Sequence, residues 1–292
     1  MKKCVIYGDV RAFYGDTHEI LLQDEVKNII MLGNMLIGVD GRDRTGWRDS
    51  ANWFMAAVKD GGRIVLTVLM TPPMNLTLYE TGNIQDDGAL DTLIGGIPAD
   101  IPVPGVMAEK SLALRFADMY KNARGIGWSV TRDQRIYALT DVAEAYLSGG
   151  YTLRPAADSD MSFLPYWIHG FNTDCHMQTG ALEDSAQTAM RHINRGSLYI
   201  LEDGKTAVSM AGNNRNMVTA GGVGPVYTPP YFRNRGYAGA CVARLSRRIL
   251  NGGKKCCVLY TDLANPVSNS LYQKIGYRAV CDSAVISFSE NP

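Results

Sequence analysis

The sequence predicts a mixed α/β fold (an α+β mixed sheet) made of two domains that follow one another along the chain. The chain has 292 residues, which is long for one domain and natural for two of about 140 residues each. Apolar residues make up 46% of the composition, enough for real cores. Segments with strand and helix patterns alternate through both halves, and Ser148-Gly149-Gly150 separates them. We therefore expect domains at residues 1–147 and 148–292.

In the first half we expect a strand, two helices, two paired strands, and then a helix, a second helix and further strands. A continuous β-branched run at 63–70 and alternation at 75–80 predict the paired strands. A helix ending at Lys59 is predicted because Asp49-Ser50 can cap its start and two glycines follow it. The other expected elements are a strand at 4–7, a helical pattern at 17–36, helices at 86–94 and 109–121, and strands at 127–130 and 135–139.

The second half repeats this order of elements. The Glu202-Asp203-Gly204 turn predicts a hairpin between strands at 197–202 and 206–211. The other expected elements are a short helix at 141–147, a strand from 151, an aromatic helix at 163–171, a helix at 182–193, and strands at 219–228 and 257–261.

Residues 223–250 predict a strand, a tight loop and a helix. Pro229 and Pro230 end the apolar strand, because neither has a backbone N–H for the sheet ladder. A helical period with one apolar stripe begins directly after the loop. The stripe consists of Ala238, Val242, Leu245 and Ile249.

The loop at 233–239 has the composition of an anion site. The first amides of a helix have no partner within the helix, and the helix dipole places partial positive charge behind them. Gly236 allows a sharp turn and close approach of a ligand, while Ala238 and Gly239 would keep the rim low. Arg233 and Arg235 add full charge. A di- or polyphosphate suits this chemistry; an ordinary strand-to-helix connection with surface arginines is the alternative.

Two motifs in this half resemble those of the GNAT superfamily of acyl-coenzyme A N-acyltransferases. Arg233-x-x-Gly236-x-Ala238 after an apolar strand resembles the loop that binds the coenzyme's diphosphate. Downstream, a strand, Asn265 and a short helix ending Leu271-Tyr272-x-x-x-Gly276-Tyr277 resemble the second motif. The resemblance covers about 150–288 well. It implies an acyl-CoA N-acyltransferase fold, in tandem form if the first half is a second copy.

The first half resembles the same unit only in outline. Before the helix near residue 111 the chain has Pro104-Gly105-Val106 and no Arg-x-x-Gly pattern. We therefore interpret residues 1–147 as a degenerate GNAT-like domain without coenzyme, and 148–292 as the acetyltransferase domain. An unrelated α/β domain in the first half is the alternative.

The resemblance implies how the coenzyme would be held. The strand at 226–228 would diverge from the strand at 257–261, leaving the amides of Val226 and Thr228 for pantetheine. Asn265 would also bond pantetheine, although an Asn-Pro turn explains this residue equally simply. The complete expected set is Val226, Tyr227, Thr228, Arg233, Asn234, Arg235, Gly236, Tyr237, Ala238, Gly239, Asn265 and Asn269.

The implied reaction is transfer of an acyl group, expected to be acetyl, from acetyl-CoA to a primary amine by direct attack. Tyr272 occupies the position of the family's general acid, and a core role for this residue is the alternative. The strand at 219–228 carries no acid, so the general base is expected to be Asp262, acting directly or through a water held by Tyr227 or Tyr260. The alternative is that the Asp262 side chain only caps the turn at Asn265, and the sequence fits both roles equally well.

Composition argues against nucleic-acid binding, membrane insertion and secretion. Lysine plus arginine equals aspartate plus glutamate at 29 each, so no global basic field favours nucleic acid. No apolar run of membrane-spanning length or signal peptide is found, and the six cysteines show no C-x-x-C spacing, so we expect a cytoplasmic protein with reduced thiols and no membrane contact.

His169 and His176 have no partners at metal-ligand spacing, so no metal is expected; His169 better suits an acceptor pocket. The expected partner is a small-molecule amine or a peptide amine, and the sequence leaves a homodimer open. A coenzyme-binding sensor or assembly module without turnover is the alternative function. A nucleotide-binding protein is a third hypothesis, although no Walker-type or Gly-x-Gly-x-x-Gly motif occurs.

Overall fold

The computed structural model describes residues 1–40, 50–82, 85–177 and 179–289. The chain forms two compact units, and each unit is assembled from segments that are not contiguous in sequence. The first consists of Met1–Ile136, Tyr260–Asn265 and Ala279–Pro292, and the second of Tyr137–Leu259 and Pro266–Arg278. The domain boundary expected at 147/148 stays a prediction, because the two compact units do not divide the chain there: the first includes residues after 148, and the second includes residues before it.

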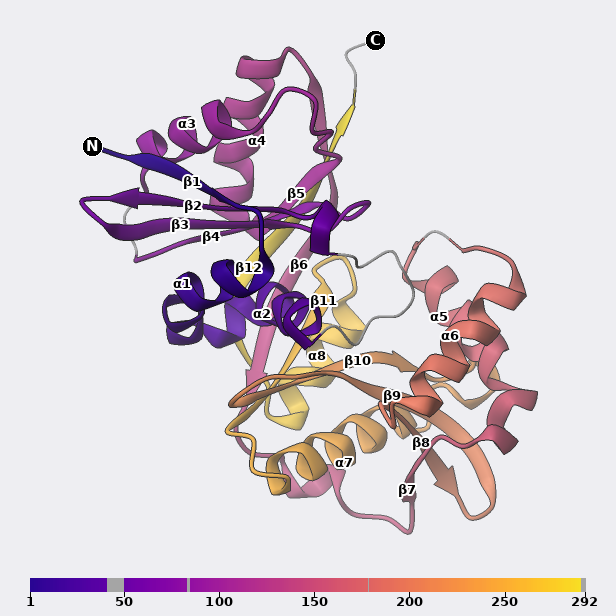
Figure 1. The fold of residues 1–292 in the computed structure, drawn as a ribbon. Coiled ribbons are helices and arrows are strands. Elements are labelled where there is room, and N and C mark those ends of the chain that lie inside the picture. The colour runs from indigo at the N-terminus through magenta and orange to yellow at the C-terminus, as the bar shows by residue number, and fades with distance from the viewer. Residues whose placement is uncertain (41–49, 83–84, 178, 290–292) are drawn as a thin grey trace. The chain divides into compact units, whose positions relative to one another are not determined.

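In the first unit the neighbouring strands follow the order β1-β2-β3-β4-β5-β12 (Figure 1). The pairs are antiparallel except for β4 and β5, which are parallel. The last strand of the chain therefore completes the sheet that the first strands begin. The elements are β1 (Lys3–Tyr7), α1 (Val10–Gln23), α2 (Glu25–Asp40), η1 (Ser50–Asn52), β2 (Phe54–Asp60), β3 (Arg63–Met70), β4 (Leu76–Glu80), α3 (Asp87–Gly96), β5 (Gly105–Glu109), α4 (Lys110–Arg124) and β12 (Arg278–Ser289).

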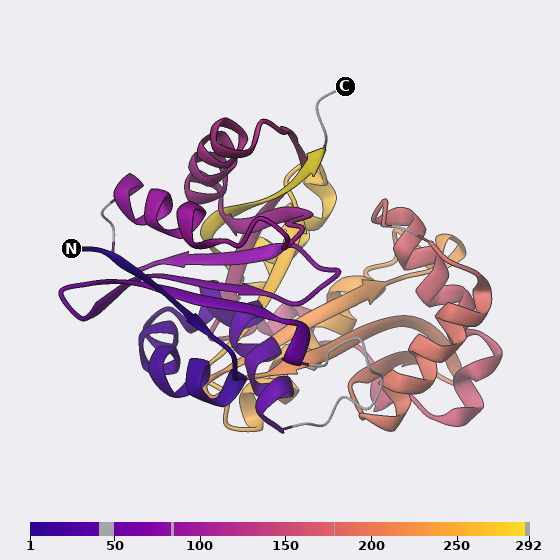
Figure 2. The ribbon, with the colours of Figure 1, turned by 45° about the horizontal axis from the view of Figure 1, so that its top comes forward.

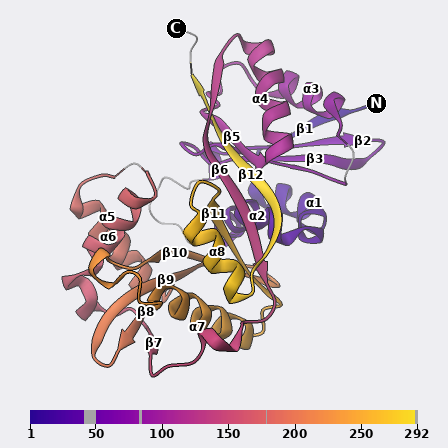
Figure 3. The same cartoon turned by 180° about the vertical axis from the view of Figure 1, so that it is seen from behind.

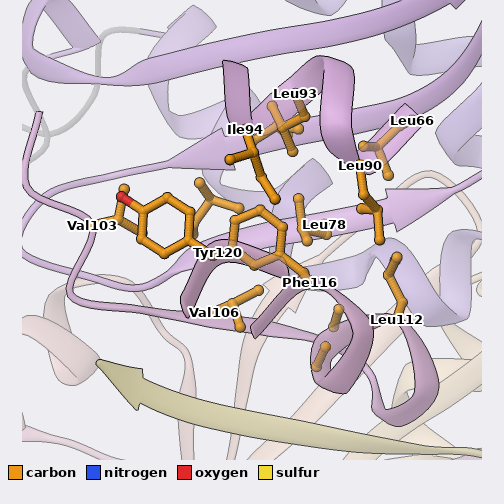
Figure 4. Packing of buried hydrophobic residues seen from close by; sticks show 14 of the residues in the cluster. Leu66, Leu78, Leu90, Leu93, Ile94, Val103, Val106, Leu112, Phe116 and Tyr120 are labelled. Carbon is orange, nitrogen blue, oxygen red and sulfur yellow. The ribbon is translucent and has the colours of Figure 1, made fainter. Parts of the chain in front are cut away.

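Helices cover both faces of this sheet. Figure 2 shows α1 and α2 on one face of β1–β4 and α3 and α4 on the other. The α3–α4 side holds the main core, in which the stacked Phe116 and Tyr120 rings lie 5.4 Å apart and pack with aliphatic side chains of α3 and the sheet (Figure 4). The first unit therefore has a packed hydrophobic core of its own, as the apolar content of the sequence predicted.

The prediction of a helix ending at Lys59 is wrong for the described residues, because residues 54–60 form strand β2. The start expected at Asp49 lies outside the described residues. Alanine, methionine and lysine favour helices, but β2 pairs with both β1 and β3 and is buried over Phe54–Val58, so tertiary packing overrides local propensity. Gly61 and Gly62 both have positive φ, at 55° and 87°. They form a hairpin turn rather than a helix end.

Two other expectations differ in detail. The helical pattern over 17–36 is two helices: the Asp9 side chain caps α1 at the amide of Ala12, and Asp24 separates α1 from α2. The two short strands expected at 127–130 and 135–139 are one strand, β6 (Gly127–Leu139), which runs from the first unit into the second.

In the second unit the neighbouring strands follow the order β11-β10-β9-β8-β7. Alternate residues of β8 face opposite ways: Leu201 packs with α7, while Ile200 packs with α5 and α6. Helix α8 packs beside α7 (Figure 3). The elements are η2 (Glu144–Tyr146), β7 (Thr152–Pro155), η3 (Asp158–Ser162), α5 (Leu164–Asp174), α6 (Leu182–Asn194), β8 (Leu198–Asp203), β9 (Thr206–Asn216), β10 (Ala220–Tyr227), η4 (Pro230–Phe232), α7 (Tyr237–Asn251), β11 (Cys256–Asp262) and α8 (Pro266–Ile275).

Candidate functional site

Strand β10 loses one of its two neighbours partway along its length. It pairs with β11 only over Ala220–Gly222, but it stays paired with β9, past a bulge, as far as Tyr227. The carbonyl of Tyr227 faces β9, where it accepts a hydrogen bond from the Ser209 hydroxyl at 3.0 Å. Successive peptide groups of a strand point to opposite sides, so those of Val226 and Thr228 face the side that β11 has left. The divergence expected from the sequence is present; what these amides bind stays a prediction.

The start of α7 presents unpaired amides. Gly236 is the N-cap residue with φ 81° and ψ 0°, a left-handed conformation that strains other residues. It offers no side-chain cap, and its carbonyl accepts the first helical bond, from the amide of Ala240. The amides of residues 236–239 bond to no other group in the described part of the chain. A Cβ on Gly236 would meet no atom within 4 Å, so the space in front of these donors is open. An anion suits this arrangement.

Gly239 has a different role from the one the sequence predicted. It is buried, and a Cβ at this position would lie 2.7 Å from the ring of Tyr146 in η2. Its lack of a side chain therefore allows η2 to pack against α7, instead of lowering the rim of an open site. Ala238 is half-buried. The sequence could not show this, because Tyr146 lies about ninety residues earlier in the chain.

The charge of Arg233 is largely engaged by the protein itself. Its guanidinium forms an ion pair with Asp174 at the end of α5, and its Nε donates to the Thr228 carbonyl at 3.0 Å. It also lies over the ring of Tyr227, 5.7 Å from the centroid. Arg235 is exposed and forms no ion pair with any described residue, so it is the arginine with its full charge available beside the α7 amides.

Tyr272 lies in α8 with its side chain only 9% exposed. Its ring packs edge-on against Tyr277, with centroids 5.9 Å apart. Burial raises the pKa of Tyr272 to about 12, and the Cys175 thiol at the end of α5 adds to the shift. Its hydroxyl bonds to none of the described residues, whereas the buried Tyr277 hydroxyl bonds to Ser246 at 2.8 Å. Tyr272 is thus a protonated donor without a partner in the described chain.

Asp262 is exposed at the end of β11 and holds a turn. Its Oδ1 accepts from the amide of Ala264 at 2.7 Å, and its carbonyl accepts from the amide of Asn265 at 3.1 Å. The turn-capping alternative is therefore observed, and the base role stays a prediction. Asp262 and Asn265 belong to the first compact unit, and Tyr272 belongs to the second.

Two further expected coenzyme contacts have their side chains occupied. Asn269 Oδ1 accepts from the Tyr137 hydroxyl at 3.0 Å, and Gln273 in turn donates to that hydroxyl at 3.1 Å. The buried Tyr237 hydroxyl donates to Asp203 at 2.7 Å. Tyr237 can therefore serve a ligand only through its backbone amide, as expected. Asn234, exposed with φ 62°, shapes the turn before Gly236.

Helix α5 contributes features that the sequence analysis missed. The hydroxyl of Tyr227 would clash with a Cβ on Gly170, so this mid-helix glycine lets the strand end approach α5. Asp174 holds Arg233, as described above. A glycine inside the aromatic helix was the available signal for close packing. His169 is half-buried on the same helix, and its Nδ1 has no hydrogen-bond partner in the described residues; its role in an acceptor pocket stays a prediction.

Comparison with known proteins places this arrangement in a recognised fold. Residues 201–285 match the family model described as FR47-like protein. A GNAT acetyltransferase from Colwellia psychrerythraea aligns over 99% of this chain and 100% of its own, with a TM-score of 0.58 and 13% identity. A Drosophila protein aligns over 100% of both chains, with a TM-score of 0.67 and 13% identity. A tandem GNAT protein from the clavulanic acid biosynthesis pathway covers 100% of this chain and 99% of its own, with a TM-score of 0.53 and 12% identity.

This chain has the GNAT fold in its tandem form. A search of curated proteins gave no match. None of the helices in the described ranges has the length and apolar character needed to span a bilayer. The described side chains also bring together no group of three or more His, Cys, Asp or Glu suited to a metal ion.

The order of elements in the GNAT fold shows which loop of the first unit corresponds to the loop at 233–239, and it is not the one that the sequence analysis compared. In the second unit the loop joins β10 to α7, and by the same order it joins β4 to α3 in the first. The region before residue 111, which the sequence analysis compared, is instead strand β5 leading directly into α4. The short strand was missed because Met107, Ala108 and Glu109 favour helices.

At that equivalent position the first unit caps its own helix with acidic groups. The carboxylate of Asp86 accepts from the amide of Ala89 at 3.1 Å, and Glu80 accepts from the amide of Asp86 at 2.9 Å. Asp87 adds a further negative charge in the first turn of α3. A phosphate would meet carboxylates here beside the remaining amides, so this helix start does not fit a coenzyme diphosphate.

Proposed function

We propose that the GNAT domain expected at residues 148–292 is an N-acyltransferase that moves an acyl group, acetyl in the simplest case, from acetyl-CoA to a primary amine. The observation that carries the proposal is the unpaired amide cluster at the start of α7 next to a strand whose peptide groups face an unfilled side. The GNAT fold supports the class of reaction. The amine belongs to a small molecule or a peptide.

The residues present fit the coenzyme. The amides of residues 236–239 would hold the diphosphate, with Arg235 adding charge, while the charge of Arg233 is shared with Asp174 and its Nε donates to the Thr228 carbonyl. The peptide groups of Val226 and Thr228 would pair with pantetheine amides as an added strand does. Bound here, the coenzyme supplies a thioester whose carbonyl an amine can attack.

Tyr272 is proposed to assist departure of the thiolate. A pKa of about 12 keeps the hydroxyl protonated throughout the neutral range, and its lack of a partner leaves the proton available. A phenol with this pKa is a weaker acid than a thiol, whose ordinary pKa is about 8.5. Its contribution is therefore a hydrogen bond that stabilises the developing sulfur anion, and the phenol keeps its proton.

Asp262 is proposed as the base that takes a proton from the attacking amine, directly or through water. The Ala264 amide would keep the carboxylate oriented while it does so. Asp262→Asn separates this role from turn capping, because an amide oxygen can still accept from the Ala264 amide but cannot take the proton. We expect an unchanged Tm with acyl transfer slowed about 100-fold. Undiminished turnover would mean that Asp262 only stabilises the turn and is not the base.

One observation favours a second function, a coenzyme-binding sensor without turnover. No residue of β10, Ala220–Tyr227, carries a carboxylate that could accept the amine proton from that strand. The two functions differ in a single experiment: titration with acetyl-CoA by calorimetry, followed by thiol detection across a panel of amines. Acyl transfer requires both binding and amine-dependent thiol release. Binding without release from any amine would favour the sensor, and no binding would refute both.

A further inference from the structure

The first unit contains a cavity of about 260 Å³, and the only residue of its lining that the sequence analysis considered for acyl transfer is Tyr260. It opens where β4 and β5 separate, since their parallel register stops after Thr77 and Met107. Helix α2, the start of α4, and β12 complete its walls. Its lining combines apolar side chains, among them Ile30, Met31 and Leu112, with a larger share of polar ones, among them Asn28, Thr77 and Ser283. Concave sites that join apolar walls to placed polar groups are where small molecules bind.

The charges that line the cavity are already paired. Lys27 Nζ lies 2.9 Å from Glu109 Oε2. Glu80 accepts two hydrogen bonds from Arg115, at 2.9 and 3.2 Å, in addition to the amide of Asp86. A charged ligand would enter without an opposite charge left to meet it, and burying an unpaired charge is costly. The lining therefore favours an uncharged molecule.

One polar group inside the cavity has no partner. Ser283, on β12, is 2% exposed and lines the cavity, and its hydroxyl bonds to no described residue. Beside it on the same strand, Cys281 also lines the cavity, and burial raises the pKa of its thiol to about 11, so the thiol stays neutral. A hydroxyl that lines a cavity and bonds to no described residue is a site at which a ligand can gain a hydrogen bond.

We propose that this cavity binds a small uncharged molecule with an apolar body and one hydrogen-bonding group, which the Ser283 hydroxyl anchors. The diphosphate of a coenzyme is disfavoured at the adjoining end, because the carboxylates of Asp86 and Glu80 lie there and accept from the amides of Ala89 and Asp86. The site does not depend on the function proposed for the second unit.

The test compares three probes with the same body and different charge: benzyl alcohol, benzylamine as its ammonium form, and benzoate. The whole chain carries ¹³C labels on its methionine methyl groups, and the resonances of Met31 and Met107 are assigned with the volume-conserving variants Met31→Leu and Met107→Leu. Met190, on α6 of the second unit, is the internal control. Probe concentrations are kept where Tm does not fall.

We expect benzyl alcohol to shift the Met31 and Met107 signals saturably and to leave Met190 unchanged, with both charged analogues at least about 5-fold weaker. Ser283→Ala should weaken benzyl alcohol by about 2- to 10-fold, the range for one hydrogen bond. Ser287→Ala, on the same strand and outside the cavity lining, should not. Absence of saturable shifts at both methionines, equal affinity for all three probes, or insensitivity to Ser283→Ala would each overturn the proposal. None of these readouts involves acyl transfer, so they are independent of its outcome.

Discussion

The starts of α3 and α7 occupy the same place in the two GNAT units and differ in what their amides meet. At α3, the carboxylate of Asp86 accepts from the amide of Ala89, and Glu80 accepts from the amide of Asp86. At α7, Gly236 provides no side chain, and Arg235 provides positive charge. Every helix start has unpaired donors and a positive dipole end. An anion site therefore requires unfilled donors without negative charge beside them, and of these two helix starts α7 meets that condition while α3 carries the carboxylates of Asp86 and Asp87.

The largest effect is expected from giving α7 the acidic character of α3. Gly236→Glu places a carboxylate at the amide cluster and forces a residue with a side chain into φ 81°. We expect acetyl-CoA affinity, measured by calorimetry, to fall at least about 100-fold, through loss of charge-assisted hydrogen bonds. Gly253→Glu is the matched control: this glycine follows the other end of α7, has φ 91° and has open space around it. It should lower Tm similarly and leave affinity unchanged; equal loss of affinity would contradict the site.

Removing the hydroxyl of Tyr272 tests whether the second unit is catalytic as well as coenzyme-binding. Tyr272→Phe should lower kcat about 100-fold and leave acetyl-CoA affinity unchanged. Tyr277→Phe removes a buried hydroxyl from the same cluster, but that hydroxyl bonds to Ser246, so its loss should lower Tm and spare kcat. The reverse pattern would remove Tyr272 from the mechanism.

The pH dependence offers a second test of Tyr272. The active form is the protonated phenol, and burial raises its pKa to about 12, so this group stays protonated through pH 10 and is half ionised only near pH 12. We expect no decline in kcat from Tyr272 between about pH 8 and 10, where an ordinary tyrosine with a pKa near 10 begins to ionise. A decline in that interval that disappears in Tyr272→Phe would show an unshifted phenol.

The first unit can be tested by removing its own cap. Asp86→Ala should lower the free energy of unfolding by about 1 kcal/mol, because the amide of Ala89 loses its side-chain acceptor and keeps only the carbonyl of residue 86. Asp91→Ala, exposed on the same helix, should change it by less than about 0.5 kcal/mol. Denaturant unfolding measures both. Calorimetry should still find one acetyl-CoA per chain, because Glu80 and Asp87 remain; a second equivalent would show that the Asp86 cap alone closes the first unit.

The smallest effect concerns the ion pair that holds Arg233. Both partners are partly exposed, so the pair contributes little to stability. Asp174→Ala releases the charge of Arg233 and should tighten acetyl-CoA binding about 2-fold at low salt, and less at high salt. Asp158→Ala makes the same change of net charge on an exposed residue without contact to Arg233 and should have no effect. Weaker binding in Asp174→Ala would mean that the ion pair positions the loop.

Local patterns predicted the strand–loop–helix at the centre of the candidate site. The apolar run before Pro229 forms strand β10, and the strand ends before the prolines. Gly236 adopts a positive φ, and the apolar stripe of α7 is buried against the sheet. These features depend on neighbours within a few residues, so the sequence alone contains the physical information that they need. The same holds for the paired strands β3 and β4.

Features that depend on distant partners were decided by the tertiary structure. Residues 54–60 favour a helix locally and become a strand because β1 and β3 flank them. Gly239 is small because Tyr146 packs against it, and Arg233 is held by Asp174 from 59 residues away. The sequence by itself determined where the helix starts and which residue turns the chain there. Which donors stay unfilled depended on groups that folding brings together, because a side chain's partner is set by distance in space.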